Sequence, residues 1–213
     1  MNNRRLKGST IVIPFVYGTQ AIPLTIRQKE DAGKGHTHKW TVFVRGLNGE
    51  DLSFLFRRVT FQLHHTYDIP TRTVEQAPYE VSETGWGESE ITIKLIFTPA
   101  CKENSLTLFH SLKLHPLDDP LQGTWQKGKT VYYFQYDELV FNDPYESFYQ
   151  VFRKQPAIEK PQKKTLAMPY SYEKELEEVD KLEEIKERLQ RQLTLFQSKI
   201  RSFESRSTKD RHH

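Results

Sequence analysis

Cysteine is almost absent from this sequence, because Cys101 is the only one among 213 residues. A single cysteine cannot form a disulfide within the chain, which fits a reducing compartment. No run of apolar residues approaches the roughly 20 needed to span a bilayer. The amino terminus, MNNRRLKGST, also lacks the apolar core of a signal peptide. We therefore expect a soluble intracellular protein without a membrane partner.

A large excess of charge of one sign is also missing, since the formal net charge is only +3 although 28% of the residues are charged. So small a surplus does not argue for nucleic-acid binding, and we expect no direct sequence-specific contact with nucleic acid. Catalytic motifs are equally scarce, because the sequence has no GxSxG and no glycine-rich phosphate loop before a helix. The expectation is a protein that is not an enzyme and needs no cofactor.

Histidine is more frequent, and eight histidines raise the question of a metal site. His36 and His38 form an HxH pair, which on a strand would point both rings the same way. Cupin-type sites that use such a pair also need a glutamate shortly after it, and Lys39–Gly46 contains none. With no cysteine pair to help, we expect no metal site.

Three regimes divide the chain. Short apolar runs alternate with turn residues from Gly8 to about Phe141, four prolines follow between 142 and 170, and 171–205 contains neither proline nor glycine. We therefore predict a β-sandwich at 8–144, a proline-containing linker at 145–170, a coiled-coil helix at 171–205 and a disordered tail at 206–213.

The first regime has the alternating pattern of half-buried strands. In one run, Ile91, Ile93 and Leu95 share a face while Thr92 and Lys94 share the other. The predicted strands are Thr10–Val16, Ala21–Ile26, Lys39–Arg45, Arg58–His64, Tyr79–Ser82, Ile91–Phe97, Leu106–Leu114 and Thr130–Tyr136, with a loop at His115–Lys129. Because no helical patterns separate them, they favour an all-β antiparallel sandwich over a parallel α/β sheet.

The third regime carries an apolar stripe at heptad spacing, interrupted by Glu175 and Lys186. A lone helix with such a stripe must bury it. A coiled coil with another protein or with a second copy is the favoured reading, and packing back on the chain's own sandwich is the alternative. The predicted partner face consists of Val179, Leu182, Leu189, Leu193, Phe196, Ile200 and Phe203.

Aromatic and small polar residues gather where predicted strands begin or end. They occur in Gly35–Trp40, in His64–Tyr67 and in Glu83–Glu88, where Trp86 stands between Gly85 and Gly87. Flanking glycines allow the backbone to approach a ligand closely and expose its N–H groups. From these residues alone, Trp86 either binds a ligand or caps the end of the sandwich.

Four segments together resemble the YEATS-domain family: GHTHKWTVFVRG (Gly35–Gly46), VTFQLHHTY (Val59–Tyr67), ETGWGE (Glu83–Glu88) and LKLHP (Leu112–Pro116). The resemblance covers about Gly8 to Pro144 and implies an immunoglobulin-like sandwich that binds acetyl-lysine or crotonyl-lysine at loops at one end. It implies that the acyl-lysine site comprises His36, His64, Thr66, Tyr67, Gly85, Trp86 and Gly87. Many family members carry an aromatic residue three positions after the tryptophan, where this chain has Ser89.

The carboxy-terminal helix resembles that of one branch of the family, which includes the glioma-amplified-sequence protein and its yeast counterpart. This resemblance implies a nuclear protein that binds acylated histone tails. It would be a subunit of a SWR-type histone-exchange remodeller or a NuA-type acetyltransferase complex, acting in transcription regulation and DNA repair. The competing hypothesis is an assembly scaffold whose pocket is silent or binds methyl-lysine. Which histone lysine is read, the preferred acyl group, the affinity and the helix's partner stay open.

Overall fold

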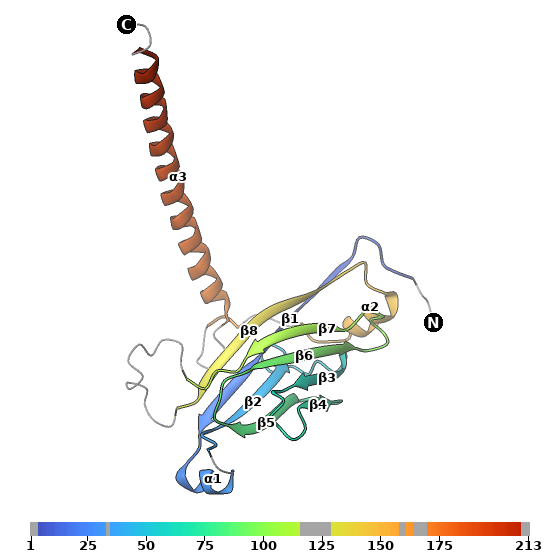
Figure 1. Cartoon of the computed structure of the whole chain (residues 1–213). Coiled ribbons are helices and arrows are strands. Elements are labelled where there is room, and N and C mark those ends of the chain that lie inside the picture. The colour runs from blue at the N-terminus through green and yellow to red at the C-terminus, as the bar shows by residue number, and fades with distance from the viewer. Residues whose placement is uncertain (1–3, 33–34, 116–128, 158–160, 164–169, 210–213) are drawn as a thin grey trace. The chain divides into compact units, whose positions relative to one another are not determined.

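The computed structural model describes residues 4–32, 35–115, 129–157, 161–163 and 170–209, with the side chains of 202–209 left aside. The chain forms two compact units, Met1–Glu159 and Lys160–His213. The first holds all the strands of the described chain, and the second holds the long carboxy-terminal helix (Figure 1).

Unit one is a sandwich of two four-stranded antiparallel sheets. The first sheet has the order β5-β2-β1-β8 and the second β4-β3-β6-β7. Their bounds are β1 Thr10–Pro23, β2 His38–Arg45, β3 Phe56–Gln62, β4 Thr71–Val74, β5 Tyr79–Gly85, β6 Glu90–Phe97, β7 Leu106–Ser111 and β8 Val131–Asn142. The predicted immunoglobulin-like antiparallel sandwich is thus confirmed.

The core lies between the inner faces of the sheets, as the alternation predicts. On β6, Ile91, Ile93 and Leu95 are buried, and on β3, Val59 and Phe61 are buried opposite them in register. These side chains form the inner face of the second sheet, because the side chains of a strand alternate between its two sides. They belong to one buried cluster with Ile13 and Phe15 on β1 of the first sheet.

One buried polar side chain, His110 on β7, links the two sheets. Its Nδ1 lies 2.9 Å from Oε1 of Gln135 on β8, and its Nε2 lies 3.1 Å from Oγ1 of Thr19 on β1. Burial lowers the pKa of His110. A neutral ring with its proton on Nδ1 satisfies both contacts, since the glutamine oxygen can only accept and the threonine hydroxyl can donate.

Strand β1 is longer than the sequence predicts, because it joins two predicted strands through Gly18. The predicted strands Thr10–Val16 and Ala21–Ile26 lie on either side of that glycine. A Cβ built on Gly18 would lie 2.4 Å from the carbonyl oxygen of Tyr133 and 2.8 Å from the ring of Phe134. The glycine therefore permits close approach of β8 inside a continuous strand.

Three other elements were missed. They are the edge strand β4, the short helix α1 (Ile26–Asp31) and the helix α2 (Glu146–Phe152). A capping box between Thr25 and Gln28 starts α1, although the pattern there was read as the end of a strand. Helix α2 lies within the predicted linker 145–170 and buries Phe148 against the sandwich core.

The antiparallel order of the strands brings three connections to one end of the sandwich. They are the segments between β1 and β2, between β3 and β4, and between β5 and β6 (Figure 1). The predicted loop His115–Lys129 falls mostly outside the described residues. The three connections at this end carry the residues singled out above.

In the second unit, α3 runs from Tyr172 to Lys209. The Oγ of Ser171 accepts a hydrogen bond from the backbone N–H of Lys174 at 3.2 Å and so caps the helix start. The prediction of a disordered tail at 206–213 is wrong for 206–209, which belong to the helix, whereas 210–213 lie outside the described residues. Within the described chain, no helix combines the length and the apolar character needed to span a membrane.

Candidate acyl-lysine site

A cavity of about 540 Å³ opens at the end of the sandwich where β2 begins and β5 ends. Its lining includes all seven residues of the predicted site: His36, His64, Thr66, Tyr67, Gly85, Trp86 and Gly87. The lining also includes Asp68, Arg72, Glu83, Thr84, Glu88 and Ser89. Residues from three separate connections thus surround one hollow, and their ligand stays a prediction.

Tyr67 forms a wall of the cavity and is held from behind by Trp40, which is buried on β2. The indole Nε1–H donates to the Tyr67 hydroxyl at 3.2 Å, and the two rings meet edge to face with centroids 5.9 Å apart. Burial and the nearby charge of Glu83 raise the pKa of Tyr67. The phenol is therefore neutral at physiological pH and fixed in orientation.

Gly85 allows Tyr67 to lie against β5. A Cβ built on Gly85 would lie only 2.7 Å from the Tyr67 hydroxyl oxygen, so any larger residue would displace the ring. The Gly85 carbonyl also accepts the backbone N–H of Thr37 at 3.0 Å, which ties the β1–β2 connection to β5. Around Gly87, in contrast, a Cβ would meet nothing within 4 Å, so packing does not require that glycine.

His64 and Thr66 form a local pair on the β3–β4 connection. The Thr66 hydroxyl lies 2.9 Å from Nδ1 of His64, and the Thr66 backbone N–H donates to the same nitrogen at 3.4 Å. A backbone N–H can only donate, so Nδ1 accepts and the ring proton resides on Nε2. The hydroxyl then donates to His64, and the Thr66 oxygen keeps lone pairs that can accept a ligand N–H.

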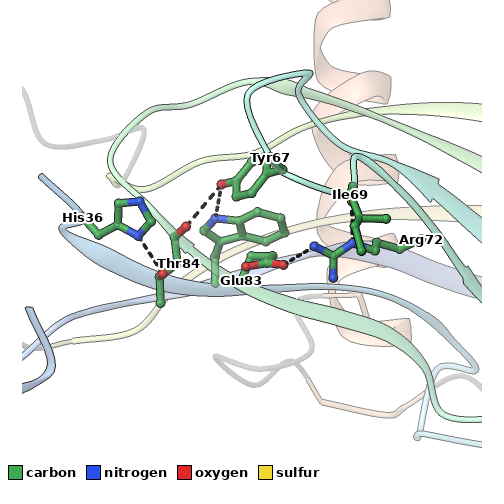
Figure 2. A network of polar contacts seen from close by, with 7 residues as sticks. His36, Tyr67, Ile69, Arg72, Glu83 and Thr84 are labelled. Carbon is green, nitrogen blue, oxygen red and sulfur yellow. Dashed lines mark hydrogen bonds and ion pairs between the residues drawn. The ribbon is translucent and has the colours of Figure 1, made fainter. Parts of the chain in front are cut away.

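His36 joins the same group of residues from the β1–β2 connection. Its Nδ1 lies 2.7 Å from Oγ1 of Thr84 on β5 (Figure 2). The carbonyl oxygen of Thr84 in turn lies 3.5 Å from the Tyr67 hydroxyl, which can donate to it. The β1–β2 and β3–β4 connections, which lie far apart in sequence, therefore both contact Thr84 on β5.

Trp86 is 72% exposed, although tryptophan is usually well buried. It directly follows Gly85 at the end of β5 and lines the mouth of the cavity. This exposure opposes the reading in which Trp86 caps the sandwich by packing into its core. The indole face is available to a ligand.

Three carboxylates also line the cavity, and none of them is among the predicted site residues. Glu83 on β5 pairs with Arg72 on β4 at 2.6 Å (Figure 2), and Glu88 pairs with Lys113 at 2.9 Å. Asp68 is exposed. These contacts were missed because β4 was not predicted, so nothing indicated that Arg72 and Glu83 are neighbours. Two of the three negative charges are balanced by a basic partner.

Glu88 also fixes the β5–β6 connection to the segment after β7. Its Oε1 accepts the backbone N–H of Leu114 at 2.9 Å. Burial alone would raise the pKa of Glu88, but hydrogen bonds from Lys113 and Leu114 outweigh it and lower that pKa. The LKLHP segment therefore contributes to the site by holding the loop that carries Trp86.

The other member of the HxH pair, His38, does not line the cavity. His38 is buried on β2 with its ring edge to face with that of His115, at a centroid distance of 5.4 Å, while His110 lies in the core. Burial, followed by the charges of His115 and Lys29, lowers the pKa of His38. Among the described residues, no three histidine, cysteine, aspartate or glutamate side chains cluster as metal ligands would.

Comparison with known proteins identifies the family. Residues 35–116 match the YEATS family model. A protein AF-9 homolog of Schizosaccharomyces pombe is 37% identical over 213 residues, which is 97% of this chain and 96% of that relative. This chain belongs to the YEATS family. A second AF-9 homolog, from Kluyveromyces lactis, is 34% identical to this YEATS chain over 209 residues. The matched region is 93% of this chain and 94% of that relative.

Solved structures agree with the sequence match. The Yaf9 YEATS domain bound to H3K27ac is 37% identical, with a TM-score of 0.62, covering 71% of this YEATS chain and 99% of that chain. A Yaf9 YEATS domain recognizing an H3K122suc peptide, also 37% identical, has a TM-score of 0.58 and covers 71% and 98%. The family assignment therefore rests on both sequence and fold.

Proposed function

We propose that this YEATS protein is a reader of acylated lysine in histone tails, acting by binding and not by catalysis. One observation carries the proposal: the seven residues predicted from sequence surround a single open cavity at the end of the sandwich. The Yaf9 domains solved with H3K27ac and with an H3K122suc peptide, both 37% identical to this chain, support the same class of ligand.

In the proposed complex, the acyl-lysine side chain lies between Tyr67 and Trp86, with its flat amide stacked on the rings. Such stacking contributes about 0.5–1.5 kcal/mol beyond the area buried. The amide N–H donates to the Thr66 hydroxyl oxygen, whose own proton is engaged by His64. The amide carbonyl accepts a backbone N–H at Trp86 or Gly87. Each neutral hydrogen bond adds about 0.5–1.5 kcal/mol.

Unmodified lysine is rejected because its ammonium would lose water without gaining a full ion pair. Burying an unpaired charge costs several kcal/mol even after relaxation. Glu83 and Glu88 do not supply that pair freely, since Arg72 and Lys113 already engage them. Asp68 is exposed, where an ion pair contributes little. The charge difference between ammonium and amide therefore favours the acylated tail.

The cavity also bears on which acyl group binds best. A planar unsaturated chain such as crotonyl presents more flat surface to Tyr67 and Trp86 than acetyl does, so we expect it to bind more tightly. Ser89 lines the cavity in place of an aromatic residue and leaves that side more open to water. We expect affinities in the micromolar to millimolar range, or about −8 to −4 kcal/mol.

Calorimetric titration of the full chain with acetylated, crotonylated and unmodified copies of one histone H3 peptide tests this proposal. We expect clear binding of the acylated peptides, at least tenfold weaker binding of the unmodified one, and loss of that difference in Trp86→Ala. The matched control is Phe109→Ala, which removes an aromatic ring that is 59% exposed on β7 and does not line the cavity. Equal affinity for acylated and unmodified peptides in the parent chain would refute the reader proposal.

Methyl-lysine is the second candidate ligand, and the carboxylates in the lining favour it. Asp68 lines the same cavity as Tyr67 and Trp86, so the lining offers a quaternary ammonium both a negative charge and aromatic rings. A trimethylated copy of the same peptide therefore belongs in the titration. The Thr66 hydroxyl and the exposed backbone favour an amide over a quaternary ammonium. Tighter binding of trimethyl-lysine than of acetyl-lysine would nevertheless identify methyl-lysine as the ligand.

For the cellular setting, we propose a nuclear subunit of a SWR-type histone-exchange remodeller or a NuA-type acetyltransferase complex, acting in transcription regulation and DNA repair. The support is the family membership together with the apolar seam of α3, which needs a covering partner. Removing 171–213 should release the protein from the complex, as measured by affinity purification and mass spectrometry, while peptide affinity persists. Co-purification of the shortened chain with remodeller subunits would contradict the role given to the helix.

A further inference from the structure

Each sheet of the sandwich ends in an edge strand on the same side of the molecule, β8 in the first sheet and β7 in the second (Figure 1). His110 on β7 contacts Gln135 on β8, so the two edge strands lie side by side. Among the described strands β8 pairs only with β1, so its other edge has no neighbouring strand in the same sheet. Such an edge is a template for an added strand wherever side chains do not close it.

The backbone contacts at the end of β8 show which of its residues face away from β1. Along an antiparallel strand, the backbone groups of successive residues point alternately toward the partner strand and away from it. The N–H of Asp143 donates to the carbonyl oxygen of Ser9, just before β1, at 2.9 Å, so Asp143 faces the β1 side. By this alternation, the backbone N–H and C=O groups of Val140 and Asn142 point outward, away from β1.

Both ends of this outward edge are closed. Glu138 also faces outward, but its N–H already donates to Oδ1 of Asp137 at 2.8 Å. Beyond the end of the strand, Asp143 has a φ of 49°, so the extended backbone stops there. The guanidinium of Arg5 lies at this end and donates to the Asp143 carbonyl oxygen at 3.1 Å. The outward edge is therefore available to an added strand only over Leu139–Asn142, which we call the open edge.

An apolar groove of about 290 Å³ lies beside the open edge, between the two sheets. Its lining includes Phe97 and Leu106 from the second sheet and Phe141 from β8. On the outer face of the first sheet, Val140 is 53% exposed and stands opposite Val12, which is 44% exposed. The side chains of an added strand alternate between its two faces. Such a strand would therefore meet apolar surface on both faces, the groove on one and the valine pair on the other.

We propose that the open edge binds an extended peptide segment of another protein, which adds a fifth strand to the first sheet. The outward N–H and C=O groups of Val140 and Asn142 would bond to the backbone of this segment. Asp137 and Glu138 are exposed carboxylates at one end of the open edge, so a basic residue of the peptide fits there. A second copy of this chain is a poorer match, because its own Glu138–Asn142 contains no basic residue.

The open edge and the acyl-lysine site lie at opposite ends of β1. Asn142 of the open edge is opposite Thr10, where β1 begins. The cavity lies where β2 begins, and His38 there is opposite Pro23, where β1 ends. At about 3.3 Å per residue, the two ends of β1 are separated by about 40 Å. The peptide site is therefore distinct from the cavity, and the inference stands whether or not the cavity reads acyl-lysine.

Selection from a phage library of random short peptides supplies the probe. The full chain is the bait, and the variant Val140→Pro is used to remove phage that bind elsewhere on the protein. We expect the selected sequences to alternate apolar and polar residues and to contain at least one lysine or arginine. A selection in which no sequence is enriched for the parent chain over the variant would overturn the proposal.

Two substitutions of Val140 separate backbone bonding from side-chain contact. Val140→Pro removes the outward N–H, and the fold should persist because proline is tolerated where an edge strand's N–H faces solvent. We expect the affinity for a synthetic copy of the selected peptide, measured by fluorescence anisotropy, to fall about tenfold. The matched control Val140→Thr keeps the N–H and a branched side chain, and the affinity should change by less than about threefold. Equal affinities of the two variants, both shown to be folded by thermal melting, would contradict strand addition.

Methylation of the peptide backbone tests the same bonds without changing the protein, so it decides the matter even if a variant fails to fold. The N–H groups of an added strand point alternately toward β8 and away from it. We expect N-methylation at one position to abolish binding, and N-methylation at the next position to change the affinity by less than about threefold. Equal sensitivity at adjacent positions, or none at all, would exclude an added strand.

Two further variants locate the peptide. Trp86→Ala, at the opposite end of β1, should bind the selected peptide as tightly as the parent chain does. A loss there would place the peptide in the cavity and refute the separate site. Asp137→Asn with Glu138→Gln keeps an acceptor for the Glu138 N–H and should weaken binding about threefold at low salt. Unchanged affinity in that double variant would overturn the assignment of a basic residue to the peptide.

Discussion

Phe61 on β3 is completely buried, whereas Leu189 on α3 remains 58% exposed, although both are large apolar residues in regular structure. The sandwich covers its apolar faces with its own second sheet. Helix α3 has a similar stripe but no covering element among the described side chains from 178 to 201. The sandwich is therefore stabilised by contacts within its own unit, whereas α3 exposes an apolar surface that a partner must bury.

The sharpest way to break this comparison is to remove one apolar side chain from each unit. Phe61→Ala leaves a cavity in the sandwich core and should lower the free energy of unfolding by about 3–5 kcal/mol. Leu189→Ala should change the unfolding of the sandwich by less than about 0.5 kcal/mol. Urea unfolding followed by tryptophan fluorescence measures both. Similar losses from the two variants would mean that the sandwich depends on α3 for its stability.

The second contrast lies within the cavity, between two glycines that flank Trp86. Gly85→Ala places a methyl group 2.7 Å from the Tyr67 hydroxyl oxygen, so we expect the affinity for acetylated peptide to fall at least tenfold and the melting temperature to fall by a few degrees. Gly87→Ala meets no atom within 4 Å and should leave the melting temperature unchanged. Calorimetry and thermal melting of both variants decide the matter, and equal melting temperatures would contradict the proposed clash.

The third contrast concerns pH, because the sandwich buries histidines whereas the described part of α3 has none. Burial lowers the pKa of His110 below that of an unfolded chain, which is about 6.5. Protonation of His110 therefore favours the unfolded state. The free energy of unfolding should have its full value above about pH 6.5 and should fall as the pH drops toward the pKa of the folded state. Urea midpoints at pH 8 and pH 5.5 measure the fall.

His38 has a lowered pKa as well and contributes a fall in the same direction. The variant His110→Gln removes only one of the two groups, so its stability should depend less steeply on pH than that of the parent chain. Identical pH dependence in the variant and the parent would show that His110 does not remain neutral in the folded sandwich.

The smallest expected effect is at Asp68, an exposed carboxylate at the cavity. A histone tail is basic around its modified lysine, so Asp68→Asn should weaken peptide binding about twofold at low salt and by less at high salt. Titration at two salt concentrations measures this. A tenfold loss would instead indicate that Asp68 contacts the modified lysine itself.

Most strands were predictable because burial on one face imposes an alternation that a single sequence reveals, as in Ile91, Ile93 and Leu95. Elements without that signal were missed. Strand β4 is a four-residue edge strand with only exposed and partly buried positions. Helix α2 anchors itself through one buried residue, Phe148, among prolines and charges. Gly18 was read as a break because its reason, the Phe134 ring on a distant strand, is not local.

The candidate site was predictable as a set of residues through its resemblance to a family, but not as a geometry. Nothing in the sequence pairs Arg72 with Glu83, because that contact depends on β4 and β5 meeting at the cavity. The same holds for the support of Tyr67 by Trp40, residues that lie 27 positions apart. Those contacts set the charge and rigidity of the cavity.

The sequence by itself determined the alternation that makes an antiparallel sandwich and the heptad stripe of α3, since each is a pattern between near neighbours. Only the tertiary structure decided that Trp86 stands exposed, that Gly85 must be a glycine and that two of the carboxylates at the cavity are paired. The physical reason is that these properties arise where separate strands end together, and contacts between distant segments leave no periodic trace in the chain.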